Sequence, residues 1–194
     1  MESKYQIILG AEESFARVVA LGVQVTRPSS VWHYLIPGIF IFDFLKRNAE
    51  IRKYSFHFLF PRKSALTTAR GILRGEPRED ALSRAEREIR SWLESLHLVS
   101  ESIVRSQTAA VELLVEHYHR LLAAKGETFE DLMVDAYGIR ETYEAFLSRL
   151  VAAEEAVDNA LKERFRDNEK VRDRLEAEKS QLKEQRRKQT NRIF

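Results

Sequence analysis

The chain has 194 residues, of which 44% are hydrophobic, and a formal net charge of +2. This length and composition suit one domain, or a compact domain with a long extension, and exclude a largely disordered chain. Cysteine is absent, which excludes disulfides, thiolate nucleophiles and cysteine-ligated metals and agrees with a reducing compartment. Because Glu12 and Glu13 interrupt the first apolar stretch, we expect no secretory signal.

The first predicted element is a helix within residues 1–27. Its apolar residues are separated by polar ones at helical intervals, which favours one amphipathic helix over residues 5–25. These apolar residues are Ile8, Phe15, Val18, Val19, Leu21 and Val23.

Residues 31–45 form an apolar run with a single formal charge, Asp43, and Lys46 and Arg47 follow it directly. Nine of the nineteen aromatic residues fall within residues 31–60. A helix needs about twenty apolar residues to span a bilayer, so this run, interrupted at Pro37, favours an interfacial or re-entrant element. A buried core segment and an exposed protein interface are the two alternatives.

The segment after this run is basic, because residues 46–75 contain eight basic and one acidic side chain. Interfacial aromatic rings and adjacent basic residues together favour binding to an anionic lipid surface. The predicted membrane-binding residues are Trp32, Tyr34, Phe40, Phe42, Phe44, Lys46, Arg47, Arg52 and Lys53. Residues 39–44 and 54–60 also alternate with period two, so an aromatic β-hairpin is a competing interpretation of this stretch.

A long antiparallel helical hairpin is predicted for residues 76–163. Its first helix starts at Pro77 and ends before Gly126, with a bend or break expected near residues 104–108, where serine and threonine blur the pattern. The second helix starts at Thr128, which forms a capping box with Asp131. Its apolar stripe is Leu132, Ala136, Ile139, Tyr143, Phe146, Leu150, Ala153, Val157 and Leu161.

The last segment, residues 164–194, alternates in charge around a thin apolar seam of Val171, Leu175 and Leu182. This pattern predicts a charged helix, partly of coiled-coil type, although a frayed tail fits it equally well. The predicted fold is therefore all-α. It comprises an N-terminal helix (1–27), an aromatic and basic membrane-associating element (28–75), a helical hairpin body (76–163) and a charged helical extension (164–194).

The strongest catalytic pattern is a pair of Glu-x-x-His sequences, Glu94 with His97 and Glu116 with His119. This spacing places a carboxylate and an imidazole on one helix face, as in di-iron carboxylate bundles. Such a site also needs an inward glutamate from each of two other helices, and the stripes offer none, so we expect no metal and no cofactor. Phosphate loops, nucleophile elbows and dinucleotide fingerprints are absent. Nucleic-acid binding is not expected, because residues 76–160 carry eighteen acidic and nine basic side chains.

Three stretches carry a resemblance to an uncharacterised bacterial protein family. They are residues 28–32 with 35–45 (Pro-Ser-Ser-Val-Trp and Leu-Ile-Pro-Gly-Ile-Phe-Ile-Phe-Asp-Phe-Leu), residues 4–9 and residues 192–194. The resemblance covers nearly the whole chain and implies no activity, ligand or catalytic residue.

The residues themselves predict a non-enzymatic, membrane-associated scaffold or adaptor at the cytoplasmic face of a membrane. It is expected to bind a protein partner or itself through the hairpin and the C-terminal helix. The alternative is a soluble helical-bundle metalloprotein or enzyme that uses the Glu-x-x-His pairs.

Overall fold

The computed structural model describes residues 2–25 and 39–194, and this part of the chain forms seven helices and no strand. The all-α prediction is therefore confirmed. The helices are α1 (Glu2–Val25), α2 (Ile39–Leu73), α3 (Arg78–Ser95), α4 (Glu101–Ala123), α5 (Phe129–Tyr137), α6 (Arg140–Arg164) and α7 (Glu169–Ile193).

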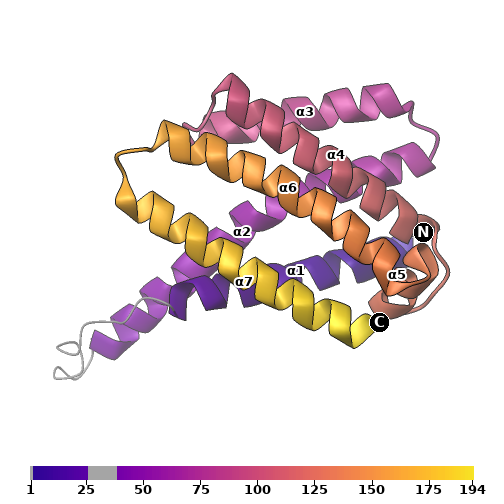
Figure 1. Ribbon diagram of the computed structural model, residues 1–194, viewed down its shortest axis with the longest axis horizontal. Helices are drawn as coiled ribbons and strands as arrows, with labels where there is room; N and C mark the ends of the chain where they lie inside the picture. The colour runs from indigo at the N-terminus through magenta and orange to yellow at the C-terminus, as the bar shows by residue number, and fades with distance from the viewer. Residues whose placement is uncertain (1, 26–38) are drawn as a thin grey trace.

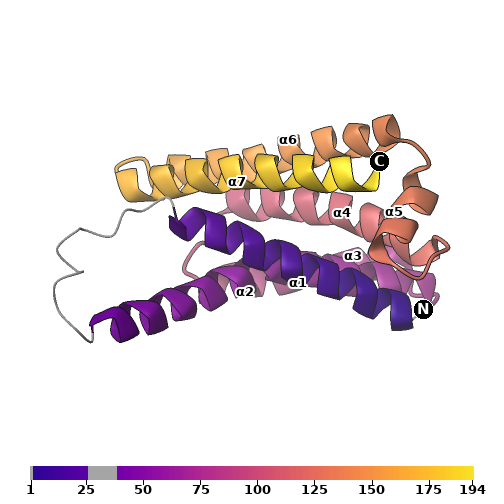
Figure 2. The ribbon, with the colours of Figure 1, turned by 90° about the horizontal axis from the view of Figure 1, so that it is seen from below.

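The helices form a bundle around α4, which packs against α2, α3, α5 and α6 (Figure 1). Seen from below, α1 and α2 form one layer and α6 and α7 the other, with α4 between them (Figure 2). The C-terminal helix α7 lies along α1, and both chain ends are at the same end of the bundle.

The core forms because α4 carries apolar side chains at spacings of three and four, which line one broad face of a helix. Val111, Val115 and Tyr118 on this face are fully buried. Ile8 of α1 and Leu66 of α2 belong to the same buried cluster. The first helix is confirmed, but its predicted apolar residues do not all face the core: Ile8 is in this cluster, Val19 and Val23 are in a second one, and Val18 and Leu21 are exposed.

The aromatic β-hairpin interpretation of residues 39–60 is wrong, because this stretch is the first part of α2. A helix places Ile51, Tyr54 and Phe58 on one face at spacings of three and four. Ile51 and Tyr54 are thereby both buried against α1 and α7. In a strand, these two residues, three positions apart, would point to opposite faces. Pro61 lies inside α2 and is buried, so tertiary packing offsets the backbone hydrogen bond that proline removes.

The break predicted near residues 104–108 is also wrong, since α4 is continuous through them. The chain turns earlier, between Ser95 and Glu101, where His97 adopts φ of 57°. Ser100 then caps α4 by accepting a hydrogen bond from the Ile103 N–H at 3.3 Å. Ser106 does not end the helix, because its hydroxyl donates to the Ser102 carbonyl at 2.9 Å.

The second predicted helix is split in two at Gly138. The capping box of Thr128 and Asp131 is confirmed. The helix that it starts ends at Tyr137, because Gly138 adopts φ of 70°, and α6 begins at Arg140. Ile139 consequently leaves the apolar stripe and is 60% exposed.

The charged C-terminal helix packs onto the bundle along one of its faces. Leu182, Arg186 and Thr190, spaced by four residues, are all buried. The thin apolar seam is thus continued by Arg186, which pairs with Glu154 of α6, and by Thr190, whose hydroxyl donates to the Arg186 carbonyl of α7 itself.

Candidate functional site

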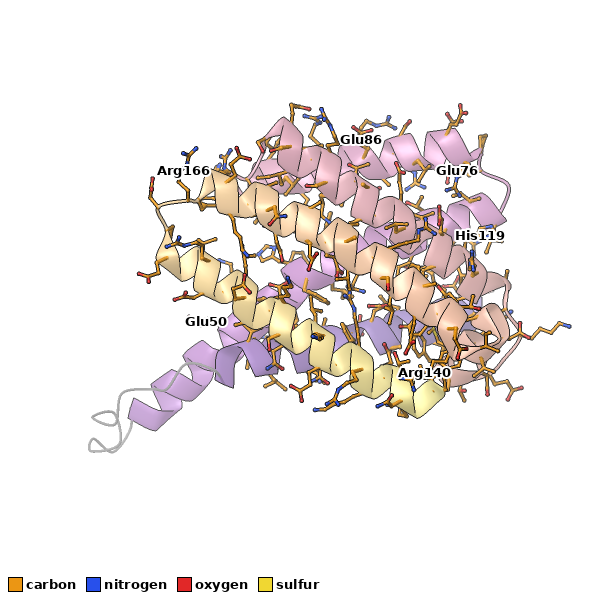
Figure 3. All side chains as sticks on the ribbon, viewed as in Figure 1. Glu50, Glu76, Glu86, His119, Arg140 and Arg166 are labelled. Atoms are coloured by element: carbon orange, nitrogen blue, oxygen red, sulfur yellow. The ribbon has the colours of Figure 1, made fainter. Side chains whose placement is uncertain are left out.

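The beginning of α2 leaves the bundle (Figures 1 and 2). Residues 49 and 50 are exposed, whereas Ile51 and Tyr54 are buried against Val19 and Val23 of α1 and Leu182 of α7. At 1.5 Å per residue, the stretch from residue 39 to residue 50 amounts to about 18 Å of helix. In Figure 3, Glu50 lies on the side where α2 diverges, and His119 lies on the opposite side.

The predicted membrane-binding residues fall in three groups. Trp32 and Tyr34 lie outside the described residues. Five more belong to the diverging part of α2, where the backbone is described and the side chains are not: Phe40, Phe42, Phe44, Lys46 and Arg47. Arg52 and Lys53 are exposed. They lie four and three residues before Phe56, which is 61% exposed, so these three side chains share one face of α2.

The remaining rings of residues 54–60 point into the protein. Phe58 packs beneath the Arg62 guanidinium, whose central carbon lies 4.6 Å from the ring centroid. Phe60 stacks on Trp92 with ring centroids 5.2 Å apart. Because Tyr54 is buried as well, a lipid-facing interpretation does not extend to these three rings, and Phe56 is the exception.

Four charged side chains from four helices meet inside the bundle. Arg62 of α2 lies 3.2 Å from a Glu12 carboxylate oxygen of α1 and 3.3 Å from Glu154 of α6. Arg186 of α7 donates two hydrogen bonds of 2.7 Å to the Glu154 carboxylate. Burial raises the pKa of Glu154, but Arg186 and Arg62 outweigh it and hold that pKa below its usual value. Two cations and two anions balance, so this buried network fastens α1, α2, α6 and α7 together.

A cavity of about 30 Å³ adjoins the network and is lined by Glu12, Arg62, Arg186 and His117, among others. One water molecule occupies about 30 Å³ in the liquid, so the cavity has room for water and not for an organic substrate. The Tyr118 hydroxyl is buried beside the network. Its pKa is raised well above the usual value by burial and by Glu12, an effect that Arg62 partly counters.

His117 belongs to an aromatic cluster and is buried. Its Nδ1 lies 2.6 Å from the Tyr137 hydroxyl, and its ring stacks on Phe146 with centroids 4.7 Å apart. Burial, followed by the charges of Arg62 and other arginines, lowers the pKa of His117 to about 3. The imidazole is therefore neutral near pH 7, and its contacts hold α4 against α5 and α6.

A second group of titratable side chains lies between α2, α6 and α7. Burial, together with Asp158 and Glu154, raises the pKa of Glu178 to about 7, against the opposing effects of Tyr54 and Arg174. Burial likewise raises the pKa of Asp158 to about 6. These carboxyl groups therefore change charge near neutral pH where α7 meets the bundle.

The two Glu-x-x-His pairs are far apart. Glu116 lies 3.9 Å from Arg78, at the first residue of α3, whereas Glu94 is sixteen residues further along that helix, which corresponds to about 24 Å. Glu116 also pairs with Arg149 at 3.4 Å. Within residues 2–25 and 39–194, no group of three or more His, Asp or Glu side chains is arranged to hold a metal ion.

The residues of the buried network were missed by the sequence analysis, although each one occupies a core position of its helix. Glu12 continues the series Tyr5 and Ile8, and Glu154 follows Leu150 at an interval of four. A charged residue at a position where the apolar stripe predicts a core residue was thus the signal in the sequence that could have indicated the buried network.

Across the described part of the chain, no helix has the length and apolarity required to cross a membrane. No protein-family model, curated protein or solved structure matches this chain. This result is consistent with the resemblance to an uncharacterised family.

Proposed function

We propose that the chain is a membrane-associated helical scaffold or adaptor without catalytic activity. The diverging beginning of α2, residues 39–50, is its proposed membrane-contacting element, together with residues 31–38 before it. The observation that carries the proposal is that α2 continues about 18 Å past the point where it leaves the bundle, and that residues 39–45 of this stretch are apolar or aromatic except for Asp43.

This geometry favours a helix that lies on or dips into the bilayer. A stretch of about 18 Å falls short of the roughly 30 Å hydrocarbon core. Burying a phenylalanine side chain stabilises by about 1.5–3 kcal/mol, and each basic residue near an anionic surface contributes about 1 kcal/mol. Phe40, Phe42 and Phe44 would therefore contribute more than Lys46 and Arg47, with the charges setting the preference for anionic lipid.

The same charges support a proposal for the side of the membrane. Anionic lipids give the cytoplasmic leaflet its negative surface potential, which attracts basic segments next to an apolar anchor. Arg52 and Lys53 are exposed on the first turns of α2 that touch the bundle, and Phe56 shares their face. We therefore place the protein at the cytoplasmic face, with the helical body available to a protein partner or to a second copy.

Flotation of the purified protein with vesicles tests this proposal. Wild-type protein is expected to float with phosphatidylcholine vesicles that contain phosphatidylserine, and to be released by detergent more readily than by salt. Replacing Lys46, Arg47, Arg52 and Lys53 by Glu should weaken the binding about a hundredfold or more, because each reversal removes about 1 kcal/mol of attraction and adds repulsion.

The matched control reverses four other exposed basic residues and so reaches the same net charge. These residues are Arg87, Arg105, Lys125 and Arg187. The control should keep most of the vesicle binding. Wild-type protein that stays at the bottom of the gradient with every vesicle composition would contradict the proposal. An equal loss of vesicle binding in both charge-reversal variants would contradict a specific role of α2.

A further inference from the structure

The outward face of α1 carries a seam of Ile7, Gly10, Ser14, Val18 and Leu21 at spacings of three and four, in which Ile7 is partly buried against the core and the other four residues are exposed. Val18 and Leu21 are each 44% exposed. The first four residues line an open groove of about 580 Å³ between α1, α7 and the start of α5. Three- and four-residue spacing is the pattern by which one helix receives another along its length.

Gly10 has no role that the described residues explain. A Cβ atom at this position would meet nothing within 4 Å. Gly22 of the same helix differs, because its missing side chain makes room for Gln181 of α7. Glycine inside a helix costs about 1 kcal/mol relative to alanine, and one benefit that offsets this cost is close approach of another backbone.

The charges around the groove fall into two groups. On the α7 edge, Lys188 pairs with Glu184 at 2.6 Å, and Arg192 pairs with Glu130 at 2.7 Å. On the other edge of the seam, Glu13 and Arg17 are exposed and make no ion pair with any residue that the structure describes. One negative and one positive side chain, one helical turn apart, are therefore free to pair with another surface.

We propose that this seam binds the same seam of a second copy of the chain, with the two α1 helices antiparallel about a two-fold axis between Ser14 and Phe15. Val18 then faces Gly10 of the second copy, where a large side chain meets a residue without one, and Leu21 faces Ile7 in an apolar contact. The same axis brings Glu13 beside Arg17 of the second copy, and Arg17 beside its Glu13. In a parallel arrangement, Glu13 and Arg17 of the two copies would lie on opposite flanks of the contact and would not meet.

The contact is isologous, as expected for a two-fold dimer, because one patch supplies both halves. Self-association was predicted through the hairpin and the C-terminal helix, and this inference assigns it to α1 instead. It goes beyond the membrane role and does not depend on it, because the seam and the diverging part of α2 are separate surfaces.

Analytical ultracentrifugation in the absence of lipid provides the first test. Wild-type protein should show a concentration-dependent mass that approaches twice 22.6 kDa. Gly10→Leu should remain monomeric over the same concentrations, and Ser83→Leu, which introduces the same leucine side chain at an exposed position of α3, should dimerise like wild type. Circular dichroism should show that both variants are folded, because the position of Gly10 is open.

Charge reversal tests the antiparallel pairing. Glu13→Arg and Arg17→Glu should each weaken the dimer by at least about tenfold, because two exposed pairs become two repulsions. An equimolar mixture of the two single variants should regain the wild-type affinity, because every cross-copy contact is again attractive. A monomeric wild-type protein, a dimer that Gly10→Leu leaves intact, or a mixture without recovery would each overturn the proposal. Vesicle flotation of Gly10→Leu separates this failure from that of the membrane role.

Discussion

Replacement of Arg62 by Met probes the buried network that joins four helices. Arg62 is 7% exposed, and its guanidinium is the ion-pair partner of Glu12, which is 8% exposed. Methionine preserves much of the apolar stem and removes the charge. Glu154 keeps its two hydrogen bonds from Arg186, whereas Glu12 loses its partner.

The expected loss of stability in Arg62→Met follows from the Glu12 carboxylate, which stays buried without its ion-pair partner. Removing one member of a buried ion pair destabilises by about 3–5 kcal/mol, because the other charge stays buried without compensation. The loss of the cation–π contact with Phe58 adds about 1 kcal/mol. For a chain of this size, the total of about 4–6 kcal/mol lowers Tm by roughly 8–24 °C.

Urea unfolding followed by circular dichroism measures this cost. The double variant Glu12→Gln/Arg62→Met should be more stable than Arg62→Met alone, because the uncompensated carboxylate is gone. A loss below about 1 kcal/mol for Arg62→Met, or a double variant as unstable as the sum of both single variants, would refute the assignment of the network as a buried, mutually dependent unit.

Three further substitutions test separate parts of the fold. The folded-state pKa of Glu178 is raised to about 7, so its protonated form favours folding, and this contribution to stability is lost as pH rises from 4.5 through 7. The stability of Glu178→Gln relative to wild type should therefore increase between pH 5 and 8. A stability difference that stays constant over this pH range would argue against burial of Glu178. The pKa of His117 is lowered to about 3, so the contribution of its neutral imidazole to folding stability is present above pH 6.5 and lost toward pH 3. In urea unfolding, the stability of His117→Phe should therefore fall less on acidification than that of wild type. At pH 7 this variant should be about 1–2 kcal/mol less stable, because the hydrogen bond with Tyr137 is lost. Gly138→Ala should lower the stability by about 1 kcal/mol because φ is 70°, and thermal unfolding at an unchanged Tm would contradict the need for glycine there.

The sequence predicted the helical class and several helix ends, because those depend on local chemistry. Pro77 precedes α3, and Thr128 with Asp131 starts α5, as the capping rules require. The breaks were harder to locate. A serine-rich stretch remained helical because Ser106 bonds to its own backbone, whereas Gly138 ended a helix whose apolar stripe continued past it.

The interior network could not be assembled from the sequence, because its partners lie far apart along the chain. Arg62 meets Glu12 and Glu154 only after α1, α2 and α6 have packed together. Likewise, residues 54–60 have the composition of the preceding apolar run, yet Phe60 stacks on Trp92, and Tyr54 packs under Leu182 of a helix more than a hundred residues later. Composition identified apolar surface and did not determine which side chains the bundle would cover.

The membrane role can be tested most directly through Trp32, one of the two tryptophans of the chain. Trp92→Phe retains an aromatic partner for Phe60 and leaves Trp32 as the single fluorophore. With anionic vesicles, we expect a blue shift of Trp32 emission and quenching by lipids that carry a quencher in their acyl chains. Emission that neither shifts nor is quenched, with vesicles in excess, would contradict the proposal that this segment enters the bilayer.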